Sequence, residues 1–381
     1  MTTGLHTREY VFDDTYTAKV YETLEGFLSL RETWDEILRI HGAHEPFLCH
    51  DWFRIWLKHF LGDANLFIII LYRDKDPVLI APLIRKKERY KRVASVRKIE
   101  LIGNIHSPVK NVFFGETDSC ERAASLRHLF NFFTTEFKNW DIIELDSIPE
   151  EIIPSDIMIS SVTKSDRSLR KYNCFNDWYL DGISYSSQEY FDRLPKKIRD
   201  ELKRRQKRIN EIGNVSFEIG FKDEQFSRYV DQYNSVRERS WKSPESDKAF
   251  LYDVRKMVNS KGWLRSAFLY VDSVPIAAQI RYVANGTGYF MEALHDKRYD
   301  KYGPGNLLRL KVIEHLIDSD QVSVIDQLRG NEPYKEYWTH LKRDRYGISI
   351  FNKTIKGYFF NYILLRLLPR IKKYTQLTNI F

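Results

Sequence analysis

The sequence KYGPGNLLRLKVIEHLI, residues 301–317, places two glycines and a proline directly before a long apolar-periodic segment. The first residues of a helix leave backbone N–H groups without partners and carry a partial positive charge. Glycines remove the side chains that would keep an anion away from those groups. Gly303 and Gly305 therefore predict a turn at which a helix N-terminus binds phosphate. No Gly-Lys-Ser/Thr sequence follows, so the turn is not a nucleotide P-loop, and the alternative is a strand-to-helix turn that needs glycine only for its geometry.

Two residues that can transfer protons, Glu292 and His295, lie on the strand that leads into this turn. Side chains alternate between the faces of a strand, so a spacing of three puts these two on opposite faces. At most one of them should therefore face a given cleft, unless a β-bulge intervenes and re-aims side chains beside the site. Each is a candidate acid–base group. The alternatives are a strand-edge salt bridge for Glu292 and a solvated turn residue for His295.

A second informative stretch is DQLRGNEPYKEYW, which begins at Asp326. Asp326 lies in a strand that is otherwise apolar, and a buried carboxylate needs a partner. Arg329 and Lys335 are the candidate partners. The pattern is compatible with a role in a site and equally with a structural ion pair.

The elements around the turn follow a regular order in the second half of the chain. Ser186 with Glu189 forms a capping box that starts a long helix, Pro195 divides it, and Gly213 ends it. Turns at Asp272–Ser273 and Asn285–Gly286 separate three strands. The expected elements are helices at 223–241, 246–262 and 306–317, strands within 263–296, and a final strand at 322–330.

The first half repeats this order of helices, strand hairpin, helix and strand, without a visible residue-level repeat. Its expected elements are helices at 24–40, 46–60 and 120–137, and strands at 65–74, 76–88 and 140–149. The stretch from Glu150 to Asp181 is less regular and marks a boundary. We predict domains at 1–165 and 166–350 and a basic amphipathic tail or helix at 351–381.

The composition is that of a globular protein, with 381 residues, 43% hydrophobic and 29% charged. The formal net charge of +8 favours anionic partners. Cys49, Cys120 and Cys174 are far apart and form no CxxC pair, which indicates a reducing compartment. The N-terminus has no signal-peptide pattern, and no stretch is long enough to span a membrane. No acid or cysteine pattern completes a metal site among the histidines, so we predict none: His41, His44, His50 and His59.

Three basic segments accompany the net charge. The run at 196–208 has eight basic residues against two acidic ones, and the run at 85–98 is a predicted hairpin. The first run is either a solvated helix face, a surface that steers an anionic acceptor such as a lipid phosphate or nucleotide-linked sugar, or a nucleic-acid surface. The C-terminal segment 357–368, followed by RIKKY, is either a docked helix or an interfacial membrane contact.

The order of strand, glycine turn, helix and strand resembles the GNAT acyltransferase fold. More narrowly, the blocks RDELKRRQKRINEIGNVSFE, IAAQI, YFMEALHDKRYDKYGPGNLL and IDQLRGNEPYKEYW resemble the acetyltransferase domain of CelD-type polysaccharide-biosynthesis proteins, relatives of the Fem aminoacyltransferases. The resemblance covers residues 184–345. It implies tandem GNAT-like domains in a mixed α/β (α+β) fold, with a degenerate N-terminal copy that holds no cofactor.

The resemblance implies an acyl-CoA co-substrate, with acetyl-CoA first among the candidates and no metal. The pyrophosphate would lie on the backbone of the turn and the pantetheine arm on the strand before it. The residues expected to bind the carrier are Phe290, Met291, Leu294, Tyr302, Gly303, Gly305, Asn306 and Leu307.

The resemblance also assigns Tyr334 as a proton donor to the leaving thiolate and Lys335 as an anion or substrate ligand. Together with Glu292, His295 and Asp326 they make up the expected catalytic set. The acceptor-binding residues expected from their place in the sequence are Trp241, Gln279 and Tyr289; each of the three has a purely structural alternative.

The predicted function is acyl-CoA-dependent N- or O-acyl transfer to a polar acceptor, such as a sugar or glycan of cell-surface polysaccharide biosynthesis. The alternatives are Fem-like transfer from aminoacyl-tRNA, which often uses a paired helical arm that is not evident here, and a non-catalytic basic scaffold. The expected location is the cytoplasm, with peripheral contact at the inner face of the membrane as an option. Nucleic acid is the least favoured partner.

Overall fold

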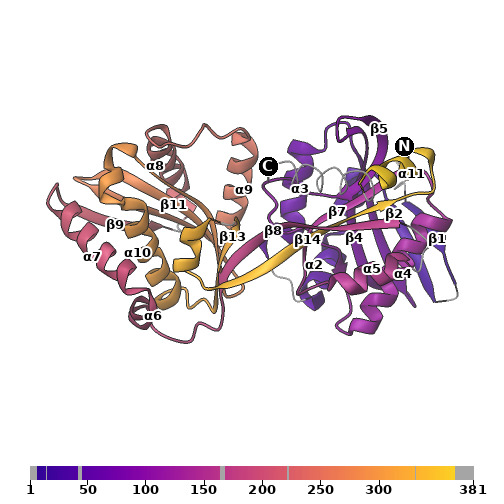
Figure 1. The fold of residues 1–381 in the computed structure, drawn as a ribbon, viewed down its shortest axis with the longest axis horizontal. Coiled ribbons are helices and arrows are strands. Elements are labelled where there is room, and N and C mark those ends of the chain that lie inside the picture. Colours follow the sequence, from indigo (N-terminus) through magenta and orange to yellow (C-terminus); the bar gives the residue numbers. More distant parts are fainter. Residues whose placement is uncertain are drawn as a thin grey trace, which may run out of the picture. The chain divides into compact units, whose positions relative to one another are not determined.

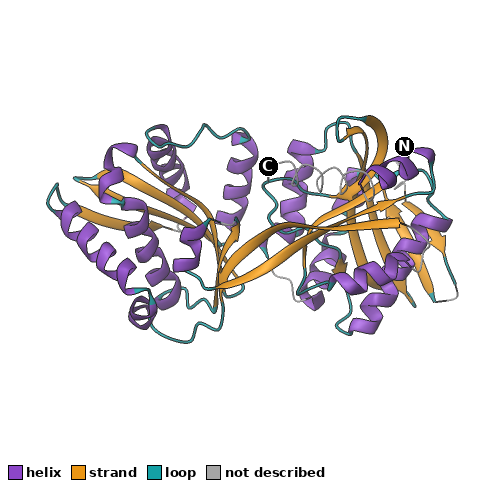
Figure 2. Cartoon of the chain, viewed as in Figure 1, coloured by secondary structure: helices purple, strands orange, loops and turns teal. Residues whose placement is uncertain are grey.

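The computed structural model describes residues 7–13, 15–41, 45–163, 168–220, 223–330 and 332–364. The chain forms two compact units (Figure 1). Unit 1 contains Met1–Phe175 and Asp344–Phe381, and unit 2 contains Asn176–Arg343. Two strands, β8 (Ser168–Leu180) and β14 (Leu341–Phe351), carry the chain from one unit to the other. The predicted mixed α/β class is confirmed, because each unit has helices packed on a mixed sheet (Figure 2).

Unit 1 is built on a sheet in the order β1-β2-β3-β4-β5-β7-β14, with β6 paired to β4. β5 and β7 run parallel, and the other pairs whose register is given are antiparallel. The strands are β1 (Thr7–Val11), β2 (Tyr16–Tyr21), β3 (Asn65–Arg73), β4 (Asp76–Tyr90), β5 (Ala94–Leu101), β6 (Phe113–Phe114) and β7 (Ile142–Pro149).

The helices of unit 1 bury aromatic and aliphatic side chains against this sheet. The side chains of Phe132 and Phe133 from α4 and Met158 from α5 join a core that includes Phe67 and Leu71 of β3. The helices are α1 (Leu24–Leu28), α2 (Arg31–His41), η1 (Pro46–Leu48), α3 (His50–Phe60), α4 (Ser119–Thr135), α5 (Ser155–Thr163) and α11 (Ile355–Tyr362).

Unit 2 has a sheet in the order β13-β12-β11-β10-β9, and the end of β8 pairs antiparallel with β13. The pair β12 and β13 is parallel, whereas β9 to β12 form antiparallel pairs. The strands are β9 (Val215–Gly220), β10 (Leu264–Val271), β11 (Val274–Ala284), β12 (Thr287–His295) and β13 (Val324–Arg329).

The helices of unit 2 cover both faces of its sheet, with α6, α7 and α10 on one face and α8 on the other (Figure 1). The apolar face of α10 forms the centre of the core through Leu308, Val312 and Leu316. The helices are α6 (Ser187–Arg193), α7 (Lys196–Asn210), η2 (Asp223–Gln225), α8 (Phe226–Glu238), α9 (Lys248–Ser260), η3 (Lys297–Tyr302), α10 (Pro304–Asp318) and η4 (Pro333–Tyr337).

Local sequence signals in unit 2 are confirmed. The Ser186–Glu189 capping box is present with both hydrogen bonds. Pro195 separates α6 from α7 and is the N-cap residue of α7. Asp272, Ser273, Asn285 and Gly286 all have positive φ angles, as a two-residue hairpin turn of the I′ type requires.

Two expectations about regular structure are wrong. The stretch from Glu150 to Asp181 was expected to be irregular but contains α5 and the long strand β8. The segment after the expected last strand continues into β14, which pairs with β7 of unit 1. Both strands carry many polar and charged residues, so their sequences lack the apolar alternation that marks a strand.

The end of the described chain docks on unit 1. Phe360 of α11 and Leu364 are buried in a cluster with Tyr90 and Phe351. Residues 365–381, the greater part of the expected basic tail, lie outside the described residues. Within the described part of the chain, no helix has the length and apolar content needed to cross a membrane.

A buried carboxylate, Asp296, fixes the end of β12. Its side chain is fully buried and pairs with Arg239 at 2.8 Å and Arg298 at 2.6 Å. It also accepts the Arg298 backbone N–H at the start of η3. Burial pushes the pKa of Asp296 upward, but the hydrogen bonds from Arg298 and Arg239 outweigh it and leave the pKa below its usual value.

We expect Asp296→Asn to lower the free energy of unfolding by about 2 kcal/mol at pH 7, because it removes the buried charge that holds the half-buried Arg239 and the exposed Arg298 through charge-assisted hydrogen bonds. Since the folded-state pKa is depressed, the contribution is present above pH 4 and is lost as the pH falls through the folded-state value. Wild type and variant should therefore converge in urea denaturation at the lowest pH at which both fold. Asp192→Asn removes an exposed carboxylate, 3.7 Å from Arg199, and should cost less than about 0.5 kcal/mol. A cost at Asp296 that does not change with pH would contradict the ion-pair account.

Candidate functional site

The turn before α10 is a left-handed corner that only glycine fills easily. Gly303 is the N-cap residue with φ 58° and ψ 48°, and Pro304 takes the first helical position. A Cβ on Gly303 would overlap the guanidinium of Arg205, which comes from α7 and covers the corner. Both the backbone conformation and the close approach of Arg205 therefore require glycine here.

The corner offers fewer free amides than the sequence predicted. The Gly303 N–H donates to the Asp300 carbonyl. The N–H groups of Asn306 and Leu307 both donate to the Gly303 carbonyl, at 3.1 Å and 3.4 Å. Gly305 N–H has no acceptor among the described residues. Of the backbone N–H groups expected to bind the pyrophosphate, those of Gly303, Asn306 and Leu307 already have acceptors, because an N-cap carbonyl accepts the first helical hydrogen bonds, and the Gly305 N–H is free among the described residues.

A cavity of about 130 Å³ opens beside this corner. Arg205 at its rim pairs with Glu201 one turn earlier in α7. A cation so near a helix N-terminus is disfavoured by the dipole unless a negative charge accompanies it. The cavity is lined by Ile198, Glu201, Leu202, Arg205, Asn306, Tyr334, Tyr337 and Trp338.

His295 lies on the same side of the sheet as the corner. Its Nε2 is 2.7 Å from Asp300 Oδ1, and its ring centroid is 4.4 Å from that of Trp241. A Cβ on Gly305 would come within 3.2 Å of His295 Nδ1, so glycine also leaves space for this ring. Asp300 fixes the orientation of the imidazole, as acid–base histidines require.

One extra residue in β12 decides where its side chains point. Glu292 pairs with Ile280 but Phe290 pairs with Arg281, so Met291 forms a bulge. Glu292 and His295 both follow the bulge and lie on opposite faces, as the spacing predicted. Glu292 faces away from α10 and pairs with Lys242 at 2.7 Å, with 30% of its side chain exposed.

The bulge coincides with the separation of β12 from β13. The two strands pair only at Thr287, Gly288 and Tyr289 of β12. Beyond Tyr289, the described residues contain no strand that pairs with this edge of β12. Phe290, Met291 and Leu294 were expected to present this edge to a carrier arm, and the free edge is compatible with that expectation.

The contacts in β13 and in the loop that follows it differ from the predicted ones. Asp326 pairs with Arg343, not with Lys335, and accepts the Leu328 N–H at 2.6 Å. Lys335 is buried and donates to the carbonyl of Arg329 at 2.7 Å, so it closes the loop instead of facing a substrate. Tyr334 is 46% exposed and lines the corner cavity with Asn306. Of the expected pair, only Tyr334 reaches the site.

The other expected residues have mixed placements. Gln279 is fully buried and donates to the Gly305 carbonyl at 2.9 Å, so its side chain helps to position the corner. Tyr289 and Leu294 are buried, whereas Trp241 is 58% exposed beside His295. Tyr302 lies under two cations, Lys301 and Arg208.

Two buried arginines next to this corner, Arg281 and Arg309, were missed by the sequence reasoning. The available signal was a charged residue inside an apolar strand and an apolar helix face, where a charge is expensive to bury. Arg205 lay within the basic run at 196–208 but carried no individual prediction.

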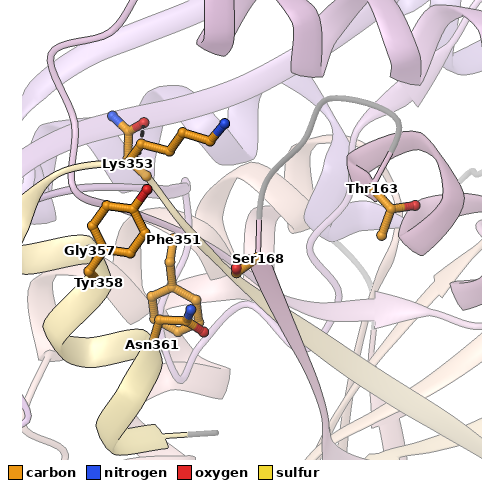
Figure 3. A pocket seen from close by; sticks show the side chains of 8 residues that line it. Thr163, Ser168, Phe351, Lys353, Gly357, Tyr358 and Asn361 are labelled. Atoms are coloured by element: carbon orange, nitrogen blue, oxygen red, sulfur yellow. Dashed lines mark hydrogen bonds between the residues drawn. The ribbon is translucent and has the colours of Figure 1, made fainter.

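A second cavity, of about 350 Å³, lies in unit 1, and the described residues that line it include no histidine or carboxylate (Figure 3). Figure 3 shows Phe351, Tyr358 and Asn361 at one side and Thr163 from the end of α5 at the other. The side-chain amide of Asn352 donates to the Trp140 carbonyl at 2.7 Å. Among the described residues, no group of His, Cys, Asp or Glu is arranged to hold a metal ion. The candidate site is therefore the α10 corner of unit 2.

Comparison with known proteins agrees with this location. Residues 196–336 match the model of a family described as the acetyltransferase (GNAT) domain, and this stretch contains the whole α10 corner. Unit 2 thus carries a GNAT-type domain. No curated protein sequence matches the chain.

Solved structures with low sequence identity share the fold across both units. FemX is 10% identical with a TM-score of 0.56, over 82% of this chain and 95% of that one. A Bacteroides thetaiotaomicron protein of unknown function is 11% identical with a TM-score of 0.51, over 85% and 97%. The C-terminal domain of a protein assigned as a lysylphosphatidylglycerol synthetase from Agrobacterium fabrum is 9% identical with a TM-score of 0.50, over 88% and 95%. The predicted arrangement of two GNAT-like halves is confirmed at the level of the fold.

We expect Gly303→Ala to lower the free energy of unfolding by about 2 kcal/mol, because the left-handed backbone is strained and Arg205 must move. Gly262→Ala is the matched control, since Gly262 has φ +69° and nothing within 4 Å of its missing Cβ. Gly262→Ala should lower the free energy of unfolding by about 1 kcal/mol, which is the cost of the left-handed backbone alone. In an Arg205→Ala background the cost at Gly303 should fall to that of Gly262. Equal costs at both glycines in urea denaturation would show that Arg205 does not occupy the corner.

Proposed function

We propose that the protein is an acyl-CoA-dependent N- or O-acyltransferase whose acceptor is a polar molecule such as a sugar of cell-surface polysaccharide biosynthesis. The observation that carries the proposal is the combination of the GNAT match at 196–336 with the glycine corner and free β12 edge inside it. An acyl carrier must be held still while its carbonyl is attacked. These two features supply an anion-binding end and a hydrogen-bonding edge.

In this proposal, the diphosphate of the carrier binds at the start of α10. Gly305 N–H is available, and Arg205 and the exposed side chain of Asn306 border the cavity. Arg205 exchanges its bond to Glu201 for a phosphate oxygen, which removes the conflict between its charge and the helix dipole. The arm of the carrier then lies along Met291 and its neighbours, on the edge of β12 opposite β11, where no strand pairs with it in the described part of the chain.

The proton route follows from the two faces of β12. Glu292 lies on the face away from α10, and we assign it as the base that takes the proton of the attacking amine or hydroxyl. His295 lies on the corner side, oriented by Asp300, and Tyr334 lines the corner cavity. Tyr334 gives a proton to the departing thiolate, so one bond to the acyl carbon forms, one breaks, and both protons are accounted for.

A second candidate is transfer of an amino acid from charged tRNA. The feature in its favour is the outer face of α7, where six basic side chains are exposed: Lys196, Lys197, Lys203, Arg204, Lys207 and Arg208. Polyanion binding by such a face is sensitive to salt. Against it, α7 is followed directly by β9, so no second helix pairs with it to form an arm.

We expect acetyl-CoA and free coenzyme A to raise the unfolding temperature of the wild-type protein. At a concentration about 100-fold above Kd, a ligand of the folded state adds about 2.7 kcal/mol. Gly305→Glu should lose the shift, because a carboxylate would occupy the phosphate position and displace His295. Ser319→Glu adds the same charge at the exposed other end of α10 and should keep it.

The thermal-shift result also separates the candidates. Stabilisation by coenzyme A that Gly305→Glu abolishes supports the acyl-CoA proposal. Absence of a shift with every coenzyme A species, combined with salt-sensitive binding of aminoacyl-tRNA, would replace it by the second candidate. Salt-sensitive binding of nucleic acid without either donor would support a scaffold.

A further inference from the structure

Two arginines are buried together under the open edge of β12. Arg281 of β11 is 1% exposed and Arg309 of α10 is 7% exposed. Both guanidinium groups lie near the Phe290 ring, at 3.8 Å and 5.6 Å from its centroid. They therefore form one cationic pair around Phe290, on the side of the sheet that α10 covers.

Arg281 is held mainly by neutral acceptors. Its Nη1 donates to the carbonyls of Ile280 at 2.8 Å and Glu292 at 2.7 Å, and its Nη2 donates to Gln279 Oε1. Its Nε is buried without a partner. The charge is thus fixed beside the bulge, since a guanidinium stays protonated in proteins.

Arg309 extends the pair toward the corner cavity. Its Nη1 donates to Gln327 Oε1 at 2.7 Å. Its guanidinium carbon is 5.0 Å from the Tyr334 ring centroid and 5.6 Å from that of Trp338. Both rings line the 130 Å³ cavity, so Arg309 lies directly behind the cavity wall.

Among the described residues, no carboxylate forms an ion pair with either arginine. The carboxylates whose charges reach the pair are already used: Glu292 binds Lys242 at 2.7 Å and Glu332 binds Lys335 at 3.2 Å. Glu201 at the cavity rim binds Arg205. The surroundings of Arg281 and Arg309 thus leave two positive charges without a counter-charge.

Such a pair is costly to fold. Buried charges are normally matched by a partner, and two like charges near each other add repulsion. Burial lowers the pKa of Arg309, and burial together with the Arg309 charge lowers that of Arg281. A protein that keeps this arrangement beside its substrate cavity gains most when an anion enters.

On the basis of the proposed function, we propose that Arg281 and Arg309 bind a carboxylate of the substrate, which reaches them through the cavity lined by Tyr334 and Trp338. Arg309 makes the direct contact, and Arg281 supplies the second charge. The carboxylate is carried either by the acyl group, as in a dicarboxylic acyl thioester, or by an acidic sugar acceptor. Planar guanidinium groups suit a carboxylate, because they offer parallel N–H donors.

The first arm of the test does not depend on coenzyme A. Thermal unfolding of the full-length protein is measured with succinate and with the neutral succinamide at fixed ionic strength. We expect succinate to bind about tenfold more tightly than succinamide, as a charge-assisted hydrogen bond predicts. Arg309→Gln should remove the preference, and Arg54→Gln, which removes an exposed charge from α3, should keep it.

Two further arms identify the source of the carboxylate. Succinyl-CoA is compared with acetyl-CoA, and glucuronate is compared with glucose in the presence of coenzyme A. A tenfold preference in the first comparison assigns the carboxylate to the donor, and in the second to the acceptor. Arg281→Gln is a second variant in case Arg309→Gln does not fold, and it should reduce the same preference.

Equal binding of charged and neutral partners in all three arms would overturn the inference, even if coenzyme A binds. A preference for succinate that depends on Arg309, without binding of any coenzyme A species, would keep the anion site and reject the proposed donor. A preference that persists in both arginine variants would place the anion elsewhere and overturn the assignment.

Discussion

The open edge of β12 depends on hydrogen bonds from two side chains of the neighbouring strand. Arg281 donates to the carbonyl of Glu292, at the point where Met291 is inserted into β12. Gln279 accepts from Arg281 and donates to the carbonyl of Gly305, in the first turn of α10. A bulge leaves backbone groups that the regular ladder does not satisfy. The hydrogen bonds of Arg281 and Gln279 thus connect the bulge in β12 to the first turn of α10. They fix the position of the strand edge relative to the corner.

This support explains why a charged residue occupies the interior of unit 2. A neutral donor of the same length could satisfy the Glu292 carbonyl, yet the structure uses a guanidinium and places Arg309 nearby. An anion bound as proposed would offset the stability lost by burying two cations. A site that is unfavourable when empty discriminates strongly between charged and neutral ligands, since the neutral ligand leaves the cost unrelieved. In the proposed anion site, the same residues shape the backbone and select the substrate.

The sequence predicted the backbone of the site better than its side-chain contacts. Gly303, Pro304 and the Asn285–Gly286 turn act through local conformation, which depends on only a few neighbouring residues. The partner predicted for Asp326 was wrong because its actual partner, Arg343, lies in β14, a strand whose polar sequence does not show the alternation that predicts a strand. The contacts of Lys335 were not predicted for a related reason. The loop carbonyls to which it donates come within reach only when the chain turns after Arg329. Side-chain pairing across strands depends on register, and register was not readable from one sequence.

The two units show why only one of them is expected to bind an anionic carrier. In unit 1, α4 precedes β7, and β7 runs parallel to β5, as α10 precedes β13, which runs parallel to β12. The two helices therefore hold equivalent places, but their first residues differ. Asp118 caps α4, and its carboxylate accepts the N–H groups of Cys120 and Glu121. A built-in carboxylate occupies the position that a phosphate would take, whereas the Gly303 cap of α10 has no side chain. Under the proposed function, the two units differ in which anion satisfies the helix N-terminus: a carboxylate of the chain in unit 1, and a phosphate of the carrier in unit 2.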